Sequence, residues 1–248
     1  MDFPFKFGRR PHDPAKLAAA PQRKFSAVLP PPSCERNTWD FDVLLCENDL
    51  IGDCTYAALA NAAKGIAALN GYTLNVDQST VVAGFATQHG ISPSDQAALE
   101  AAEGLEMADV LNFMQQHGFN VGNQLLAGTW GTLGLDRSSL ALALAHLGIG
   151  YWGITLYDSD VAAFQSGSVW DTIATRGNVV SGHAVTAWDY SGLGDTDIVR
   201  ICTWGTMQVA TWRWVADRLD EAHGVTFPSL GPASGKWFAG YDPGTINV

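Results

Sequence analysis

The chain has 248 residues, of which 47% are apolar, 10% aromatic and 16% charged, and its formal net charge is −11. An apolar fraction this large can build a substantial core and excludes intrinsic disorder as the overall state. With 14 basic against 25 acidic side chains, binding to nucleic acid in general or to an anionic membrane surface is disfavoured, because both need a basic surface.

Three further compositional features bear on location and surface. The apolar runs are far shorter than the roughly 18 residues of a membrane-spanning helix, and no secretory signal is visible, so the sequence predicts synthesis in the cytoplasm. The four cysteines are then expected to be free thiols, with Cys34 and Cys46 able to pair only in an oxidising environment. Nine tryptophans beside so few charges indicate either a large core or a surface covered by partner subunits.

Residues 1–33 are rich in proline and basic side chains and predict an extended arm or linker ahead of one domain over residues 34–248. Phe3, Phe5 and Phe7 alternate along this arm. The arm could therefore lie as a strand along its own domain or along a neighbouring subunit, and a floppy tail is the alternative.

Helices are predicted first and strands later. The alanine-rich stretch after Gly52-Asp53, which ends at Asn70-Gly71, predicts the longest helix. Further helices are expected over 94–102, 107–117 and about 138–147, then strands over 149–156, 179–190 and 197–204 with a short helix over 159–165. Thr211 is expected to cap a last helix over 212–222, and 223–227 predicts a final short strand. This order predicts an α+β fold with a site in the cleft between its halves.

A cysteine at a helix start and a histidine on a strand carry the chemistry. Cys54 opens the first helix, where backbone N–H groups and the helix dipole lower the pKa of a thiol. Among six histidines, His183 is the best candidate for the base, because it begins an alternating strand and Gly182 leaves room beside it. Asn48, six residues before Cys54, could donate its amide to an oxyanion. Together these groups predict nucleophilic attack on an acyl carbon. The alternative is that Cys54 is an ordinary buried thiol, His183 a hydrogen-bonded strand histidine and Asn48 a turn residue.

These motifs, in this order, resemble those of the papain-like cysteine peptidases. The matching segments are N-D-L-I-G-D-C-T-Y-A-A over 48–58, G-H-A-V-T-A-W-D-Y over 182–190 and T-W-G-T over 203–206, within a resemblance that covers roughly residues 39–227. The resemblance implies a helical half packed against an antiparallel sheet, with Cys54 as nucleophile, His183 as base and Asn48 as oxyanion donor.

The sequence departs from that family at three points. Asn48 stands where the peptidases usually have glutamine, and Cys202 stands where they have the asparagine that orients the histidine. Because a thiol is a weak hydrogen-bond partner, His183 would be held less firmly, which weakens such a triad without abolishing its chemistry. A long inhibitory pro-segment, as in secreted papains, is also not expected before Cys54.

A narrower resemblance concerns papain-like proteins encoded by tailed bacteriophages and prophages. It is carried by F-G-R-R-P-H-D-P, G-D-C-T-Y-A-A, and T-W-G followed by T-W-R-W-V-A-D-R-L-D-E-A. In that group the helix after T-W-G, here over 212–222, replaces part of the papain strand. The resemblance implies a virion structural or decoration protein that retains the Cys–His pair and binds capsid or tail subunits through its arm.

The sequence therefore leaves three functions open, with a slight preference for the virion component. The second is an active cysteine peptidase or amidase acting on a peptide or amide bond. The third is transglutaminase-like acyl transfer, with Asp195 or Asp197 completing a Cys–His–Asp set. No cofactor is predicted, and no metal either, because paired Cys-x-x-Cys or His-x-x-x-His motifs are lacking. An enzyme should have Cys54 and His183 within hydrogen-bond reach in an open cleft, whereas a structural protein could have that cleft filled by its own arm.

Overall fold

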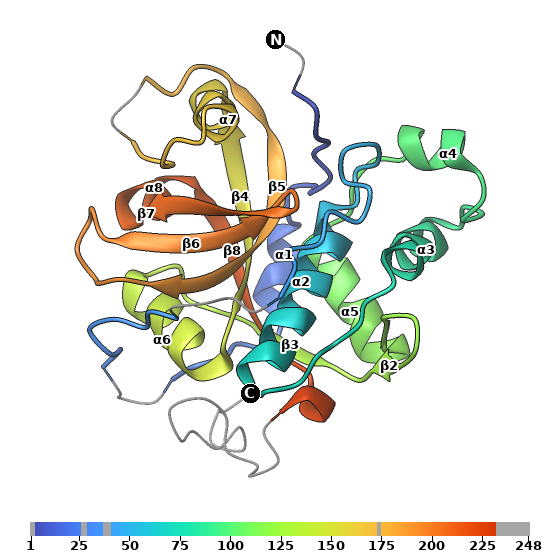
Figure 1. Cartoon of the computed structure of the whole chain (residues 1–248), viewed down its shortest axis with the longest axis horizontal. Helices are drawn as coiled ribbons and strands as arrows, with labels where there is room; N and C mark the ends of the chain where they lie inside the picture. Colours follow the sequence, from blue (N-terminus) through green and yellow to red (C-terminus); the bar gives the residue numbers. More distant parts are fainter. Residues whose placement is uncertain (1–2, 26–28, 37–40, 173–174, 232–248) are drawn as a thin grey trace.

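A helical half and a sheet half lie side by side in the computed structural model, which describes residues 3–25, 29–36, 41–172 and 175–231 (Figure 1). The helices are α1 (Pro14–Ala19), α2 (Cys54–Leu69), α3 (Gln78–His89), α4 (Gln96–Ala101), α5 (Met107–His117), α6 (Arg137–Leu147), α7 (Asp158–Gln165) and α8 (Trp212–Arg218), with a 3-10 turn η1 (Pro228–Leu230). The strands are β1 (Phe119–Asn120), β2 (Leu125–Leu126), β3 (Thr129–Thr132), β4 (Gly150–Tyr157), β5 (Val179–Tyr190), β6 (Ile198–Thr203), β7 (Thr206–Thr211) and β8 (Leu219–Thr226). Every helix among these described residues is too short or too polar to cross a membrane.

Six strands form one antiparallel sheet in the order β3-β8-β4-β5-β6-β7. The longest strand, β5, pairs with both β4 and β6 and so lies inside the sheet. The two edges are each accompanied by a further segment, because Gln22 bridges Thr132 on β3 and Trp170 bridges Ala210 on β7. Part of the backbone at each edge is therefore paired within the chain.

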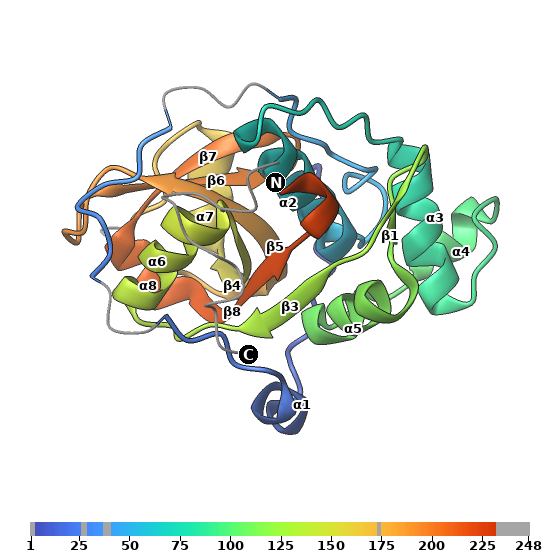
Figure 2. The same ribbon diagram turned by 90° about the horizontal axis from the view of Figure 1, so that it is seen from below.

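Helix α2 lies against β5 and joins the two halves. Its alanine-rich sequence keeps the helix surface small, so that nearly every residue from Cys54 to Ala67 is buried. Thr186 on β5 donates its hydroxyl to the Ala58 carbonyl, and Tyr151 on β4 donates to the Thr55 carbonyl. One apolar cluster fills the space around α2, and a second packs α6 and α8 against the other side of the sheet. Figure 2 shows α3, α4 and α5 gathered on the side of α2 away from the sheet.

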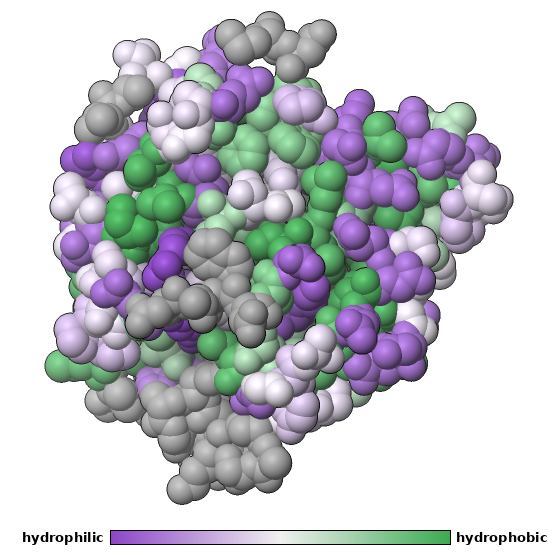
Figure 3. Space-filling view, viewed as in Figure 1, coloured by the Kyte–Doolittle hydropathy of each residue, from purple (hydrophilic) through white to green (hydrophobic). Residues whose placement is uncertain are grey.

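The tryptophans are explained by this core. All seven that the structure describes are buried, namely Trp130, Trp152, Trp170, Trp188, Trp204, Trp212 and Trp214, whereas Trp39 and Trp237 lie outside the described residues. The surface in Figure 3 mixes hydrophilic and apolar side chains, with a mostly hydrophilic area over α3 and α4. Of the two explanations for the composition, the large core accounts for the described tryptophans.

Most predicted elements are confirmed, and the end of the chain is the main correction. Eight of the predicted segments are found nearly as expected, as α2, α4, α5, α6, β4, α7, β5 and β6. The helix predicted over 212–222 is wrong beyond Arg218, because its second half belongs to β8, where Ala222 pairs with Trp152. A strand, β7, follows T-W-G directly instead of a helix. Helix α3 and strands β1 to β3 were not predicted.

The described part of the arm lies along its own chain. Pro21 and Arg23 exchange backbone hydrogen bonds with Thr132 on β3, and Cys34 donates its N–H to the Tyr190 carbonyl on β5. Between Asp13 and Ala20 the chain forms α1, which stands out from the body of the molecule in Figure 2. Met1, Asp2 and the end of the predicted domain, 232–248, lie outside the described residues.

Candidate active site

Cys54 is the first residue of α2, beneath a tight loop. Cys46 and Glu47 in that loop have φ angles of 52° and 62°, the left-handed conformation that turns the chain back toward the helix. The Cys54 side chain is 1% exposed, and its Sγ accepts a hydrogen bond from the Ala184 N–H at 3.4 Å. Burial raises the pKa of Cys54 to about 12, although N–H groups of Ala184 and Gly8 act in the opposite direction. The thiol is therefore neutral in this arrangement, despite its place at a helix N-terminus.

His183 lies on β5, where the strand passes the start of α2. Its Nε2 is 2.7 Å from the Thr203 hydroxyl, and its ring stacks on Trp204 with centroids 4.2 Å apart. Its Nδ1 is buried and has no hydrogen-bond partner among the described residues. Burial lowers the pKa of His183 to about 3, with a further contribution from the positive charge of Arg9. The imidazole is therefore also neutral.

One small cavity brings together all four residues that the sequence singled out. Asn48, Cys54, His183 and Cys202 line it, with Thr203 and Trp204 beside them. Its volume is only about 10 Å³, which is the space of about one water molecule. The structure thus gathers the predicted residues around one closed space rather than an open cleft, and Cys54 Sγ and His183 Nδ1 are not hydrogen-bonded to each other in it.

The hydrogen bond to His183 comes from Thr203 rather than from Cys202. Cys202 instead directs its Sγ toward Met207 Sδ at 3.8 Å, and its burial raises its pKa, so it holds a proton. Thr203 is the last residue of β6, directly before Trp204 turns the chain with a φ of 42°. Sequence reasoning missed Thr203, because the family pattern drew attention to the position before it. The available signal was its hydroxyl at the end of a predicted strand beside Trp-Gly.

Asn48 is 2% exposed, and both its side chain and its backbone carbonyl are hydrogen-bonded. Its side-chain amide donates to the Ile51 carbonyl at 3.0 Å, and its own carbonyl accepts from the Lys6 N–H at 2.7 Å. An amide nitrogen carries two hydrogens, and the second one faces the carboxyl of Asp53. Asp53 lies nearby, fully buried, and burial raises its pKa well above the ordinary value, against a hydrogen bond from Asn48.

The N-terminal arm fills the cleft over these residues. Lys6 is held between Asn48 and Trp204, whose indole N–H donates to the Lys6 carbonyl at 3.3 Å. Phe7 meets the His183 ring edge-on with centroids 6.2 Å apart. Further along, Gly8 accepts from the Leu105 N–H at 2.8 Å. The arm therefore bridges the helical half and the sheet half directly above Cys54.

Gly8 passes through a slot between two other glycines. A Cβ atom on Gly8 would lie 1.6 Å from the Gly52 carbonyl oxygen, and one on Gly104 would lie 1.6 Å from the Gly8 carbonyl oxygen. Because backbone atoms form the walls of this slot, only a glycine main chain fits there. The lack of a side chain at Gly8 is thus what allows the arm to reach the level of Cys54.

Arg9 fastens the arm to β8. Its guanidinium donates to Glu221 and Asp220 at 2.6 Å each and to the Ile154 carbonyl at 3.2 Å. His223 lies 3.0 Å from the other carboxylate oxygen of Glu221. Burial raises the pKa of Glu221, but the hydrogen bonds and charges of His223 and Arg9 outweigh this, so its pKa is lowered overall. Arg9 is buried, and the pairing compensates for its lost hydration.

The same acidic residues bear on metal binding. His12, Asp220 and Glu221 present ligand atoms within 4.8 Å of one another. The guanidinium of Arg9 already pairs with both carboxylates, so a metal ion would have to displace a buried positive charge. These residues therefore fit the anchoring of the arm better than they fit a metal site.

Asp195 and Asp197 lie away from His183. Both belong to the turn that joins β5 to β6, beyond the paired residues Tyr190 and Val199. Asp195 pairs with Arg137, and Asp197 accepts from the Gly194 N–H. The structure therefore contradicts the Cys–His–Asp set that the transglutaminase hypothesis requires.

Comparison with known proteins shows the fold. No protein-family model matches the sequence, and no curated protein sequence matches it. Among solved structures, the chain is similar to xylellain, a cysteine protease from Xylella fastidiosa, with a TM-score of 0.67 and 15% identity over 92% of this chain and 98% of that one. It is also similar to the digestive procathepsin L 3 of Tenebrio molitor larval midgut, with a TM-score of 0.61 and 13% identity over 91% and 77% of the two chains. A third match is procathepsin B of Trypanosoma congolense, with a TM-score of 0.52 and 11% identity over 90% and 86%. The chain has an α+β, papain-like fold, as predicted.

Proposed function

We propose that the protein is a cysteine hydrolase of peptide or amide bonds that is kept latent by its own N-terminal arm. The observation that carries the proposal is the shared cavity of Cys54 and His183, with His183 held by Thr203. The structural similarity to cysteine proteases supports this class of chemistry. The arm explains why both groups are neutral, because it buries them.

In the proposed reaction, displacement of the arm admits water and substrate. The burial that raises the pKa of Cys54 and lowers that of His183 is then reduced, so the thiol proton can move to the imidazole. The thiolate attacks the carbonyl carbon, and the oxyanion is stabilised by the Cys54 N–H and by the Asn48 amide, whose second N–H turns from Asp53 to the oxyanion. His183 gives its proton to the leaving amine, and water then hydrolyses the acyl-enzyme with His183 as base.

A non-catalytic role in a phage particle is the second candidate, and it stays a prediction. The closed cavity of about 10 Å³ is the observation that favours it, because a protein that needs no substrate can keep its cleft filled. On this hypothesis the fold serves to bind neighbouring subunits, and Cys54 and His183 are remnants.

Hydrolysis of a mixed peptide library by the wild-type chain and two variants separates the two candidates. Gly8→Ala is designed to displace the arm, and Gly8→Ala combined with Cys54→Ser removes the nucleophile from the same opened chain. We expect cleavage by Gly8→Ala, little by the wild-type chain and none by the double variant. If Gly8→Ala exposes Cys54 to alkylation but cleaves nothing, the hydrolase proposal is wrong and the non-catalytic role is favoured.

A further inference from the structure

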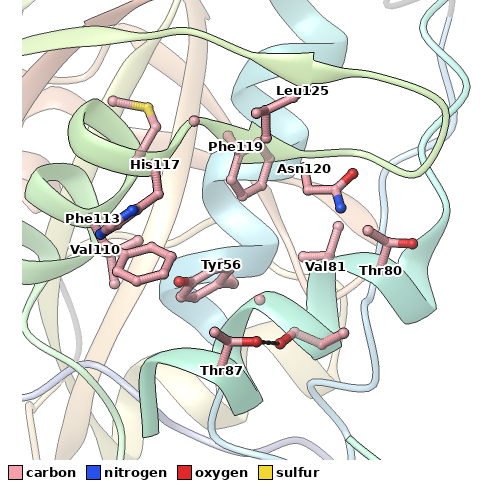
Figure 4. Close-up of a pocket in the computed structure, with 14 residues that line it drawn as sticks. Tyr56, Thr80, Val81, Thr87, Val110, Phe113, His117, Phe119, Asn120 and Leu125 are labelled. Atoms are coloured by element: carbon pink, nitrogen blue, oxygen red, sulfur yellow. Dashed lines mark hydrogen bonds between the residues drawn. The ribbon is translucent and has the colours of Figure 1, made fainter. Parts of the chain in front are cut away.

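A second cavity lies in the helical half, apart from the residues around Cys54. It has a volume of about 210 Å³ and is enclosed by α2, α3, α5 and the β1–β2 hairpin. Figure 4 shows the rings of Tyr56, Phe113 and Phe119 around it, with Val81 and Leu125 closing two further sides. Walls from four elements make this a cup rather than an extended groove.

Glycines and one hydrogen bond keep the walls of this cup in place. A Cβ on Gly84 in the middle of α3 would lie 2.7 Å from the Tyr56 ring, so the missing side chain makes room for that ring. The Tyr56 hydroxyl donates to Gln88 at 2.8 Å, which fixes the ring against α3. Gly118 has a φ of +79°, and it turns the chain from α5 into β1 so that Leu125 lies directly against it. A glycine inside a helix costs about 1 kcal/mol relative to alanine, and here it is used to shape the cavity.

The cavity is lined mainly by apolar side chains. The described residues that line it include no Asp, Glu, Lys or Arg. Burial raises the pKa of Tyr56, so its hydroxyl stays neutral as well. Thr87 uses its hydroxyl within α3, where it donates to the Ala83 carbonyl. The polar residues at the rim are Thr80, His117 and Asn120 (Figure 4). Thr80 donates its hydroxyl to Asp77, whereas Asn120 accepts from the Gly122 N–H through its side-chain oxygen and keeps its amide N–H groups for another acceptor.

We propose that this cavity binds a small neutral molecule with a single aromatic ring and one hydrogen-bond acceptor. The volume of the cavity, about 210 Å³, sets the size of the ligand, since an apolar protein cavity of about 150 Å³ is enough to hold benzene. The three aromatic walls offer edge-to-face and stacked contacts to a ring. The lining has no Asp, Glu, Lys or Arg, which disfavours a charged ligand, because the hydration that such a ligand loses would not be replaced. The Asn120 amide is placed to donate to the acceptor at the mouth of the cup.

Phenol is a suitable probe, and phenylacetate is its charged counterpart. In the full-length protein, titration with phenol is expected to shift the methyl signals of Val81, Val110 and Leu125 saturably, and to give intermolecular NOEs between ring protons and these methyls. Phenylacetate is expected to bind at least about tenfold more weakly. NOEs to other parts of the protein, or shifts that rise linearly without saturation, would overturn the proposal.

A cavity-filling variant provides the matched test. Ala83 lines the cup on α3, so Ala83→Phe should occupy the space and abolish the saturable shifts. Ala97→Phe, at an exposed position on α4, adds the same ring elsewhere and should leave phenol binding unchanged. Equal binding by both variants contradicts the assigned site. If Ala83→Phe does not fold, the NOEs in the wild-type chain decide the question alone.

Discussion

Thr203 is the side chain on which the orientation of His183 depends. Its hydroxyl lies 2.7 Å from Nε2, whereas Cys202 contacts Met207. Thr203→Val keeps the shape but removes the hydrogen bond, so a buried ring nitrogen is left unpaired at a cost of about 1–3 kcal/mol. We expect the free energy of unfolding to fall by this amount and the ¹⁵N signals of the His183 ring to shift. Cys202→Ala is the control, since it should leave those ring signals in place. Ring signals that respond to Cys202→Ala and not to Thr203→Val would assign the orienting role to the cysteine.

The neutral state of His183 predicts a pH dependence of stability. Its pKa is lowered from 6.5 to about 3 in the folded protein, mainly by burial and also by Arg9. Between these values the unfolded chain binds a proton that the folded chain does not. The contribution of the neutral His183 ring to the free energy of unfolding is therefore complete above about pH 6.5 and is lost as the pH falls toward 3. One proton corresponds to a slope of up to about 1.4 kcal/mol per pH unit.

Urea unfolding at several pH values measures this slope. His183→Gln should unfold with a shallower dependence on pH between 6.5 and 4 than the wild-type chain. His117→Gln, at an exposed position, should keep the wild-type slope. If His183→Gln and the wild-type chain lose stability in parallel, His183 is not buried as a neutral ring.

At the scale of elements, the arm segment around Gly8 is the part of the chain that closes the cleft. A side chain on Gly8 would overlap the Gly52 carbonyl, so Gly8→Ala must move the arm or the loop before α2. Each 1.4 kcal/mol of strain shifts the balance toward the open state about tenfold. We therefore expect the alkylation rate of Cys54, resolved by peptide mapping, to rise at least about tenfold. Lys6→Ala is the control, because the exposed Lys6 side chain can be shortened without losing the backbone hydrogen bonds. An unchanged rate in Gly8→Ala would mean that the arm does not protect the thiol.

Elements with a strong local signal could be predicted from the sequence, and elements fixed by tertiary contacts could not. The alanine-rich run of α2 ends at Asn70-Gly71 and needs no further information. In α3, Thr80, Val81 and Val82 are β-branched and weaken the helical signal, so this helix depends on packing against α2. Residues 219–222 have helical propensity, yet they form β8 because β4 pairs with them and Arg9 binds Glu221.

The site shows the same division. Cys54 and His183 could be found from a helix start and a strand start, because each position has a local signature. The contact of Thr203 with His183 could not, since it depends on the hairpin of β6 and β7. Trp204 and Gly205 both have positive φ, of 42° and 72°, as in a two-residue hairpin turn that ends β6 at Thr203. The occupation of the cleft by Lys6 to Arg9 could not be predicted from the sequence either, because the partners of these residues lie up to 212 positions away along the chain.

At the scale of the whole molecule, residues 3–10 act as a cross-link between the two halves. Leu105 of the helical half exchanges backbone hydrogen bonds with Gly8 and Arg10, and on the other side Arg9 reaches Asp220 and Glu221 of the sheet. Phe3 and Phe5 add contacts to Trp204, with ring centroids 4.8 and 5.6 Å away. The segment that closes the site is thus also part of the packing that holds the halves together.

This double role predicts that Arg9 contributes far more to stability than its neighbour. Arg9→Met leaves the fully buried Glu221 without its cation, which should lower the free energy of unfolding by about 3–5 kcal/mol in urea at neutral pH. Arg10→Met removes a half-exposed guanidinium whose carboxylate partners lie 3.6 and 3.9 Å away, and should cost at most about 1 kcal/mol. Combining Arg9→Met with Glu221→Gln removes the stranded charge and should restore part of the loss. Equal effects of Arg9→Met and Arg10→Met would show that the arm rests on the surface without supporting it. If the predicted difference is found, opening of the cleft requires the buried ion pair to be broken first, so the arm is a far stronger closure than its Phe contacts alone would make it.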